Sequence, residues 1–163
     1  MLAARYIRIY ELDWHQTATV EGLKFTSHPM VHYSSRGLFD KNETLWCSWS
    51  ILSSKKRLYF AGDTAYSPIV FQEIGGFDCA LLPIGTYGNR KYGFNNHMNP
   101  KESFQAGLDI KAQSMIAIHW GTIDLSEEPL FEPVEKFKKV PLEKEFDPKR
   151  LWILKIGETR VLE

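Results

Sequence analysis

Apolar and polar positions in the first half of the chain follow the pattern of two β-hairpins. Residues 17–20 and 23–26 are β-favouring and are joined by Glu21-Gly22, a tight-turn dipeptide. Residues 45–52 and 57–61 are separated by a polar turn and predict a second hairpin. The stretch between the hairpins is polar and contains glycine, so we expect a loop from residue 27 to residue 44.

The second half alternates apolar strands with helices. Ser67-Pro68 and Asn99-Pro100 open helices, because each places a proline at an early helical position, and Gly75-Gly76 ends the first helix. The predicted helices cover residues 67–74, 101–108 and parts of 124–139, and the predicted strands cover residues 6–10, 79–85, 115–119, 151–155 and 159–162. Hairpins followed by strand–helix–strand alternation predict an α/β (α+β) fold, a mixed sheet with packed helices.

Length and composition fit one globular domain. The chain has 163 residues, of which 44% are hydrophobic and 25% charged, and we expect residues 1–163 to form a single domain. Twenty basic and 20 acidic residues give a net charge of zero, which offers no electrostatic footprint for nucleic acid. No stretch approaches the roughly 20 apolar residues of a membrane span, and Cys47 and Cys79 form no disulfide framework. We therefore expect a cytoplasmic protein.

Two apolar strands end in side chains that bind metals. Residues 58–61 run into Gly62-Asp63-Thr64, and residues 116–118 run into His119. Open α/β sheets bind ligands at the carboxyl ends of their strands. Imidazole suits zinc, and a carboxylate can bridge two metals. The pattern predicts a metal site at one edge of the sheet, with the remaining histidines, His15, His28, His32 and His97, as further candidates.

Other catalytic motifs are absent from the sequence. It contains no Gly-x-Ser-x-Gly, which disfavours a serine hydrolase of that type. It also lacks the Gly-rich phosphate-binding loop and the Gly-x-Gly-x-x-Gly fingerprint, so nucleotide binding by those routes has no support.

Residues 60–68 resemble the Gly-Asp-Thr segment of the metallo-β-lactamase superfamily, and more closely that of the N-acyl-phosphatidylethanolamine-hydrolysing phospholipase D family. The resemblance covers most of residues 11–135, and its further segments follow in the same order: residues 11–14, 36–50, 77–85, 97–102 and 117–122. It implies an αββα sandwich and two zinc ions in a complete site. The implied reaction is phosphodiester hydrolysis by a zinc-activated hydroxide on a phospholipid substrate, with peripheral contact to a membrane.

The resemblance also implies roles for individual residues. His32 matches the ligand of the first zinc, Asp63 the carboxylate that bridges both zincs, and His119 the ligand of the second zinc. His97 matches a histidine near the substrate phosphate that does not bind metal, so Asp63 and His97 are the expected catalytic residues. His15 and His28 match no functional position.

One family motif is missing. No His-x-His-x-Asp-His sequence occurs anywhere in the chain, although in the family it supplies two ligands to each metal. The chain therefore resembles the C-terminal half of the fold, with helices on one face of its sheet and apolar surface left open. Such a half is expected to form a homo-oligomer or to pair with a missing N-terminal half.

Several readings of the function remain open at this point. A phospholipase D-type hydrolase is the first of them. The alternatives are another hydrolase of the superfamily, similar to sugar-phosphate lactonases, and a non-catalytic binding or dimerisation module.

Overall fold

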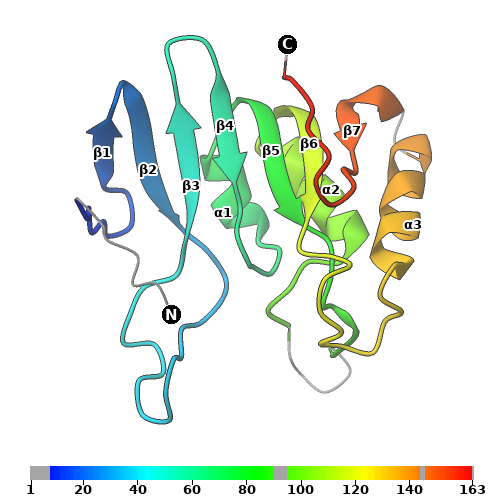
Figure 1. Ribbon diagram of the computed structural model, residues 1–163, viewed down its shortest axis with the longest axis horizontal. Helices are drawn as coiled ribbons and strands as arrows, with labels where there is room; N and C mark the ends of the chain where they lie inside the picture. Colours follow the sequence, from blue (N-terminus) through cyan, green and yellow to red (C-terminus); the bar gives the residue numbers. More distant parts are fainter. Residues whose placement is uncertain (1–7, 90–94, 144–145, 163) are drawn as a thin grey trace.

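A single mixed sheet forms the centre of the computed structural model, which describes residues 8–89, 95–143 and 146–162. Its strand order follows the chain, from β1 to β7 (Figure 1). The antiparallel strands are β1 (Thr17–Val20), β2 (Leu23–Pro29), β3 (Cys47–Leu52) and β4 (Arg57–Phe60). The sheet continues with β5 (Phe77–Pro83), β6 (Ala112–Ile118) and β7 (Leu151–Trp152), and each of these strands pairs in parallel with the strand before it.

The helices follow the parallel strands. They are α1 (Pro68–Glu73), α2 (Pro100–Asp109) and α3 (Glu132–Lys139), with short 3-10 turns at Val140–Glu143 and Pro148–Arg150. The predicted cap of α2 is confirmed: the Asn99 side chain accepts the backbone N–H of Glu102 at 3.0 Å, and the Glu102 carboxylate accepts that of Asn99 at 3.1 Å. This reciprocal pair satisfies two free N–H groups and sets where α2 begins.

The hydrophobic core lies between these helices and one face of the sheet. Tyr59, Leu82 and Met115 lie on neighbouring strands and are fully buried. They share one core with the buried Phe71 of α1, Phe104 of α2 and Phe137 of α3. The expected mixed sheet with helices on one face is confirmed, since α1 and α2 lie behind the sheet in Figure 1.

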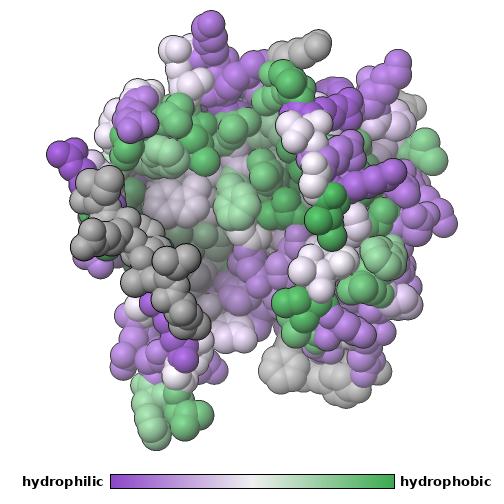
Figure 2. All heavy atoms as spheres, in the orientation of Figure 1, coloured by the Kyte–Doolittle hydropathy of each residue, from purple (hydrophilic) through white to green (hydrophobic). Residues whose placement is uncertain are grey.

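The opposite face of the sheet carries an open apolar groove of about 420 Å³. Figure 2 views this face, where apolar side chains surround a hollow in front of β2–β4. Phe60 is 39% exposed there, although Tyr59 beside it is buried in the core. The groove is lined by Tyr10, Leu12, Ala18, Val20, Phe25, Trp49, Ile51 and Phe60.

Three expectations about the elements were wrong. Residues 159–162 form no strand, and Arg160 instead places its guanidinium 4.2 Å from the centre of the Trp152 ring. β2 continues through His28 and Pro29, where a loop was predicted, because these residues pair with Ser48 and Cys47 of β3. Residues 8–10 are irregular, and the rest of the strand predicted for residues 6–10 lies outside the described residues.

Other boundaries moved by a few residues. β5 and β6 begin earlier than predicted, at Phe77 and Ala112, and α3 begins only at Glu132. The residues that precede α3 are held in a non-helical segment by contacts to the loop after β5, described below.

The open groove predicts self-association of the chain on its own, because large exposed apolar patches are costly in water. We expect sedimentation velocity to show a dimer or larger species at micromolar concentration. Phe60→Ser should shift the distribution towards monomer, while Ile69→Ser should not, because Ile69 lies on α1 and is 73% exposed. A clean monomer of the unmodified chain would contradict this expectation.

Candidate metal centre

The carboxyl ends of the parallel strands bring two site residues to one edge of the sheet. Asp63 follows β4, after Gly62 turns the chain in the left-handed region at φ 67°. His119 follows β6 directly and is itself left-handed, at φ 58°. The parallel pairing continues past β4, since the N–H of Ala61 donates to the carbonyl of Leu81 at 3.0 Å. This edge is where ligands bind in open α/β sheets.

Thr64 attaches the segments that carry the other two histidines. Its buried hydroxyl accepts the N–H of Val31 at 3.1 Å, which holds His32 beside Asp63. Its carbonyl accepts the N–H of Met98 at 3.0 Å, which holds His97 on the other side. Thr64 therefore fixes, through backbone groups, two residues that lie more than 30 positions away in sequence.

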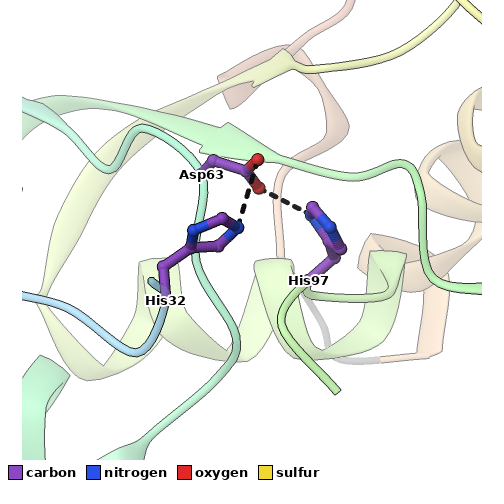
Figure 3. Close-up of side chains that lie close together, drawn as sticks. All are labelled: His32, Asp63 and His97. Carbon is purple, nitrogen blue, oxygen red and sulfur yellow. Dashed lines mark hydrogen bonds and ion pairs between the residues drawn. The ribbon is translucent and has the colours of Figure 1, made fainter. Parts of the chain in front are cut away.

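Three imidazoles converge on the Asp63 carboxylate. His97 Nδ1 lies 2.6 Å from Asp63 Oδ1, and the Nε2 atoms of His32 and His119 each lie 3.4 Å from Asp63 Oδ2. In Figure 3 the rings of His32 and His97 point at the carboxylate from two separate loops. Ligand atoms of His32, Asp63 and His97 all lie within 4.8 Å of one another.

The hydrogen bonding of His32 fits a metal ligand. Its Nδ1 lies 3.0 Å from the carbonyl oxygen of Tyr33 and donates to it, and the Tyr33 ring stacks on the imidazole at 4.8 Å. With that proton on Nδ1, the lone pair of the buried Nε2, which lies 3.4 Å from Asp63 Oδ2, is available to a metal. Metal-binding histidines are commonly oriented by such a bond from their other nitrogen. Two or more imidazoles with one carboxylate are a donor set that divalent transition metals accept.

Charge coupling shifts the pKa values of this cluster. Burial alone would raise the pKa of Asp63, but the imidazoles of His119, His32 and His97 hold it well below its usual range. Contact with the Asp63 carboxylate raises the pKa of His32 and of His119, against the opposing effect of burial. The cluster thus favours an ionised Asp63 and, when no metal is bound, the protonated forms of His32 and His119.

The structure brings together the four residues predicted from sequence: His32, Asp63, His97 and His119. The assignment of His97 to the substrate instead of the metal stays a prediction. His28 hydrogen-bonds the Ser50 hydroxyl at 3.0 Å within the sheet, so it makes an ordinary structural contact. The role of Thr64 was not predicted, and its place beside Asp63 is the only signal of that role in the sequence.

The chain matches a known protein family over most of its length. Residues 2–120 match the family model described as the beta-lactamase superfamily domain. The chain belongs to the metallo-β-lactamase superfamily. This membership implies a divalent metal, and the His and Asp cluster at the sheet edge provides a candidate site for it.

Relatives in this superfamily include named phospholipases. The chain is 33% identical, over 81% of its length, to N-acyl-phosphatidylethanolamine-hydrolyzing phospholipase D 1 of Caenorhabditis elegans, and spans 40% of that protein. It is 35% identical, over 80% of its length, to the mitochondrial enzyme of that name from Saccharomyces cerevisiae, and spans 30% of it. An uncharacterised protein of Mycobacterium tuberculosis is 42% identical over 79% of this chain. The chain spans 36% of that protein, and so well under half of each relative.

Solved structures share the fold at low identity. A metallo hydrolase from the archaeon Ignicoccus hospitalis superposes with a TM-score of 0.67 at 22% identity, covering 91% of this chain and 58% of that one. The isothiocyanate hydrolase from Delia radicum gut bacteria gives the same TM-score at 19% identity, covering 93% of this chain and 58% of that one.

In the part of the chain that the structure describes, no helix has the length and apolar character needed to cross a membrane.

The pKa shifts predict how stability depends on pH without metal. The raised pKa values of His32 and His119 add stability that is complete below about pH 6.5 and is lost as pH rises through their folded-state values. The lowered pKa of Asp63 adds stability above about pH 4. In EDTA, the melting temperature should therefore be higher at pH 6 than at pH 9.

Asp63→Ala is the matched variant for this measurement, because it removes the carboxylate that raises both histidine pKa values. It should flatten the decline between pH 6 and pH 9. Zinc affinity should change in the opposite direction and increase with pH, because binding requires neutral imidazoles. A melting temperature that rises from pH 6 to pH 9 in EDTA would contradict the assigned coupling.

Proposed function

We propose that this chain supplies part of the active site of a dizinc hydrolase, which cleaves a phosphodiester. The single observation that carries the proposal is the convergence of His32, His97 and His119 on Asp63 at the carboxyl edge of the sheet. Bound zinc would supply an activated hydroxide and would stabilise charge on the phosphoryl oxygens. Residues 1–163 would form a single, partial metallo-β-lactamase-like domain.

The residues of this chain have separate roles in the proposal. His32 would hold the first zinc through Nε2, and His119 the second through Nε2. Asp63 would be the ligand shared by both metals, and His97 would contact the substrate phosphate. His97 contacts one carboxylate oxygen of Asp63, while His32 and His119 face the other, and this division is compatible with those roles.

The substrate class is proposed from the relatives. Two of them are named as phospholipases that hydrolyse N-acyl-phosphatidylethanolamine, so a phospholipid is the proposed substrate. Exposed apolar side chains follow His119 in sequence: Ile123 is 65% exposed and Leu125 is 60% exposed. Peripheral contact with a membrane and a cytoplasmic location are parts of the same proposal.

The residues that this chain offers do not complete a dizinc site. A catalytic zinc usually has three protein ligands and a water, and the His-x-His-x-Asp-His ligands of the family are absent from this sequence. Additional ligands would come from residues outside this sequence or from a second copy of the chain. If neither supplies them, the proposal becomes that of a binding or dimerisation module.

Asp63→Ala tests the proposal, because it removes a ligand of both metals together. With the additional ligands supplied by a second copy of the chain, the purified protein should bind zinc and hydrolyse N-acyl-phosphatidylethanolamine vesicles or bis(p-nitrophenyl) phosphate, and EDTA should abolish the activity. Asp63→Ala should lose the zinc-dependent activity and weaken zinc binding. Glu73→Gln is the control, because Glu73 is exposed on α1 and should leave both properties unchanged.

Retained activity in Asp63→Ala would exclude the dizinc assignment. A wild-type chain that binds no zinc and cleaves neither substrate would favour the non-catalytic module. Cleavage of a lactone but of neither phosphodiester would favour the lactonase-like alternative.

A further inference from the structure

The carboxylate of Glu128, which lies outside the histidine cluster, holds the loop that lies against His119 through several hydrogen bonds. We call this set of bonds to residues 86–88 the clamp. Glu128 Oε1 accepts the backbone N–H groups of Thr86 at 2.5 Å and Tyr87 at 3.2 Å, and Oε2 accepts that of Gly88 at 2.7 Å. The Ser126 hydroxyl also donates to Oε2. Successive backbone N–H groups that point at one anion form a nest, which is a concavity that binds anions.

The surroundings of Glu128 favour its ionised form. Burial opposes ionisation, but the hydroxyl of Ser126 and the N–H groups of Gly88 and Thr86 together hold the pKa of Glu128 below its usual value. Hydrogen bonds to a charged acceptor are about twice as strong as neutral ones. The clamp therefore has charge-assisted bonds at both of its oxygens.

The clamped loop is strained at Thr86. Thr86 has φ 65°, a left-handed conformation that is unusual for a β-branched residue. Such a conformation persists only where the surrounding contacts determine it. The bond from Thr86 N–H to Glu128 is one of those contacts, and the bonds to Tyr87 and Gly88 hold the next two residues.

The same loop lies directly against the backbone of His119. The N–H of Ile84 donates to the carbonyl of Ile118 at 3.1 Å. Gly85 packs so closely on His119 that a Cβ at Gly85 would collide with the His119 carbonyl oxygen. His119 is itself left-handed at φ 58°, and its Nε2 is aimed at Asp63. Two strained residues, Thr86 and His119, are thus in adjacent segments at the metal centre.

The bonds from Glu128 also connect the segment that follows His119 back to the loop of residues 85–88 beside it. The segment that leaves the site at His119 turns at Gly121, runs to Ser126 and ends on Glu128, which binds back to the loop beside His119. A second contact strengthens it: the Tyr87 hydroxyl donates to Glu132 at 2.7 Å, and Lys136 pairs with Glu132 at 2.6 Å.

We propose, on the basis of the metal-dependent function proposed above, that Glu128 is a positioning residue for His119. Glu128 holds residues 86–88, these residues hold Gly85 against the His119 backbone, and the His119 imidazole is thereby aimed at the metal and Asp63. Glu128 touches neither metal nor substrate in this arrangement. Its loss should affect metal affinity through the orientation of His119.

Glu128→Gln is the direct test, because it keeps the size of the side chain and replaces one acceptor oxygen by a donor. Zinc affinity of the full chain, measured by calorimetry, should fall about 10-fold or more, as for other residues that orient metal ligands. Glu135→Gln is the matched control, because Glu135 is exposed, belongs to the same region and pairs with Lys138 only at the surface. It should leave the affinity unchanged.

A second variant separates positioning from general destabilisation. Thr86→Gly removes the penalty of the left-handed conformation, since glycine adopts positive φ freely. In the Glu128→Gln background it should restore a large part of the zinc affinity. Absence of any restoration would overturn the proposed route through Thr86.

A metal-free readout distinguishes failure of the clamp from failure of the proposed function. By NMR without metal, Glu128→Gln should make the amides of Thr86 and Gly88 exchange about 10-fold faster or more. It should also shift the ring resonances of His119, while Glu135→Gln does neither. Faster exchange with unchanged His119 resonances, or wild-type zinc affinity in Glu128→Gln, would overturn the proposal. A wild-type chain that lacks phosphodiesterase activity would overturn only the proposed function.

Discussion

The attraction between one half-buried carboxylate and three imidazoles is the constraint on which the site depends. Asp63 is taken out of full contact with water, which by itself disfavours its charge, and His32, His97 and His119 compensate for that cost. Each imidazole reaches Asp63 from a different segment. The site therefore exists only when the β2–β3 connection, the loop before α2 and the end of β6 are all docked on the end of β4.

The parallel and antiparallel halves of the sheet position different residues of the site. Parallel pairing of β4, β5 and β6 places Asp63 and His119 at one edge, and Tyr59, Leu82 and Met115 on these strands are buried in the core shared with the helices. The antiparallel half positions His32, which lies in the connection between β2 and β3. Its outer face carries an uncovered apolar groove. The uncovered face is consistent with a chain that spans only 30 to 40% of its named relatives.

Local signals in the sequence predicted most of the elements and two of the site residues, Asp63 and His119, whereas His32 and His97 were assigned through the family resemblance. Asn99-Pro100 marked the start of α2, and the Gly-Asp-Thr turn marked the end of β4, because caps and turns depend on neighbouring residues. The strand predicted at residues 159–162 failed because a strand needs a partner, and this segment contacts Trp152 through a side chain instead. Thr64 and Glu128 were not predicted, since their hydrogen bonds join segments that are distant in sequence.

The most direct test of the account is the location of zinc in a crystal of this chain. Anomalous diffraction above and below the zinc absorption edge would identify the metal independently of any activity. The account predicts a zinc peak within coordination distance of Asp63 and of Nε2 of His32 or His119, and no such peak in Asp63→Ala. Zinc bound elsewhere on the chain, with the Asp63 cluster empty at saturating metal, would contradict it.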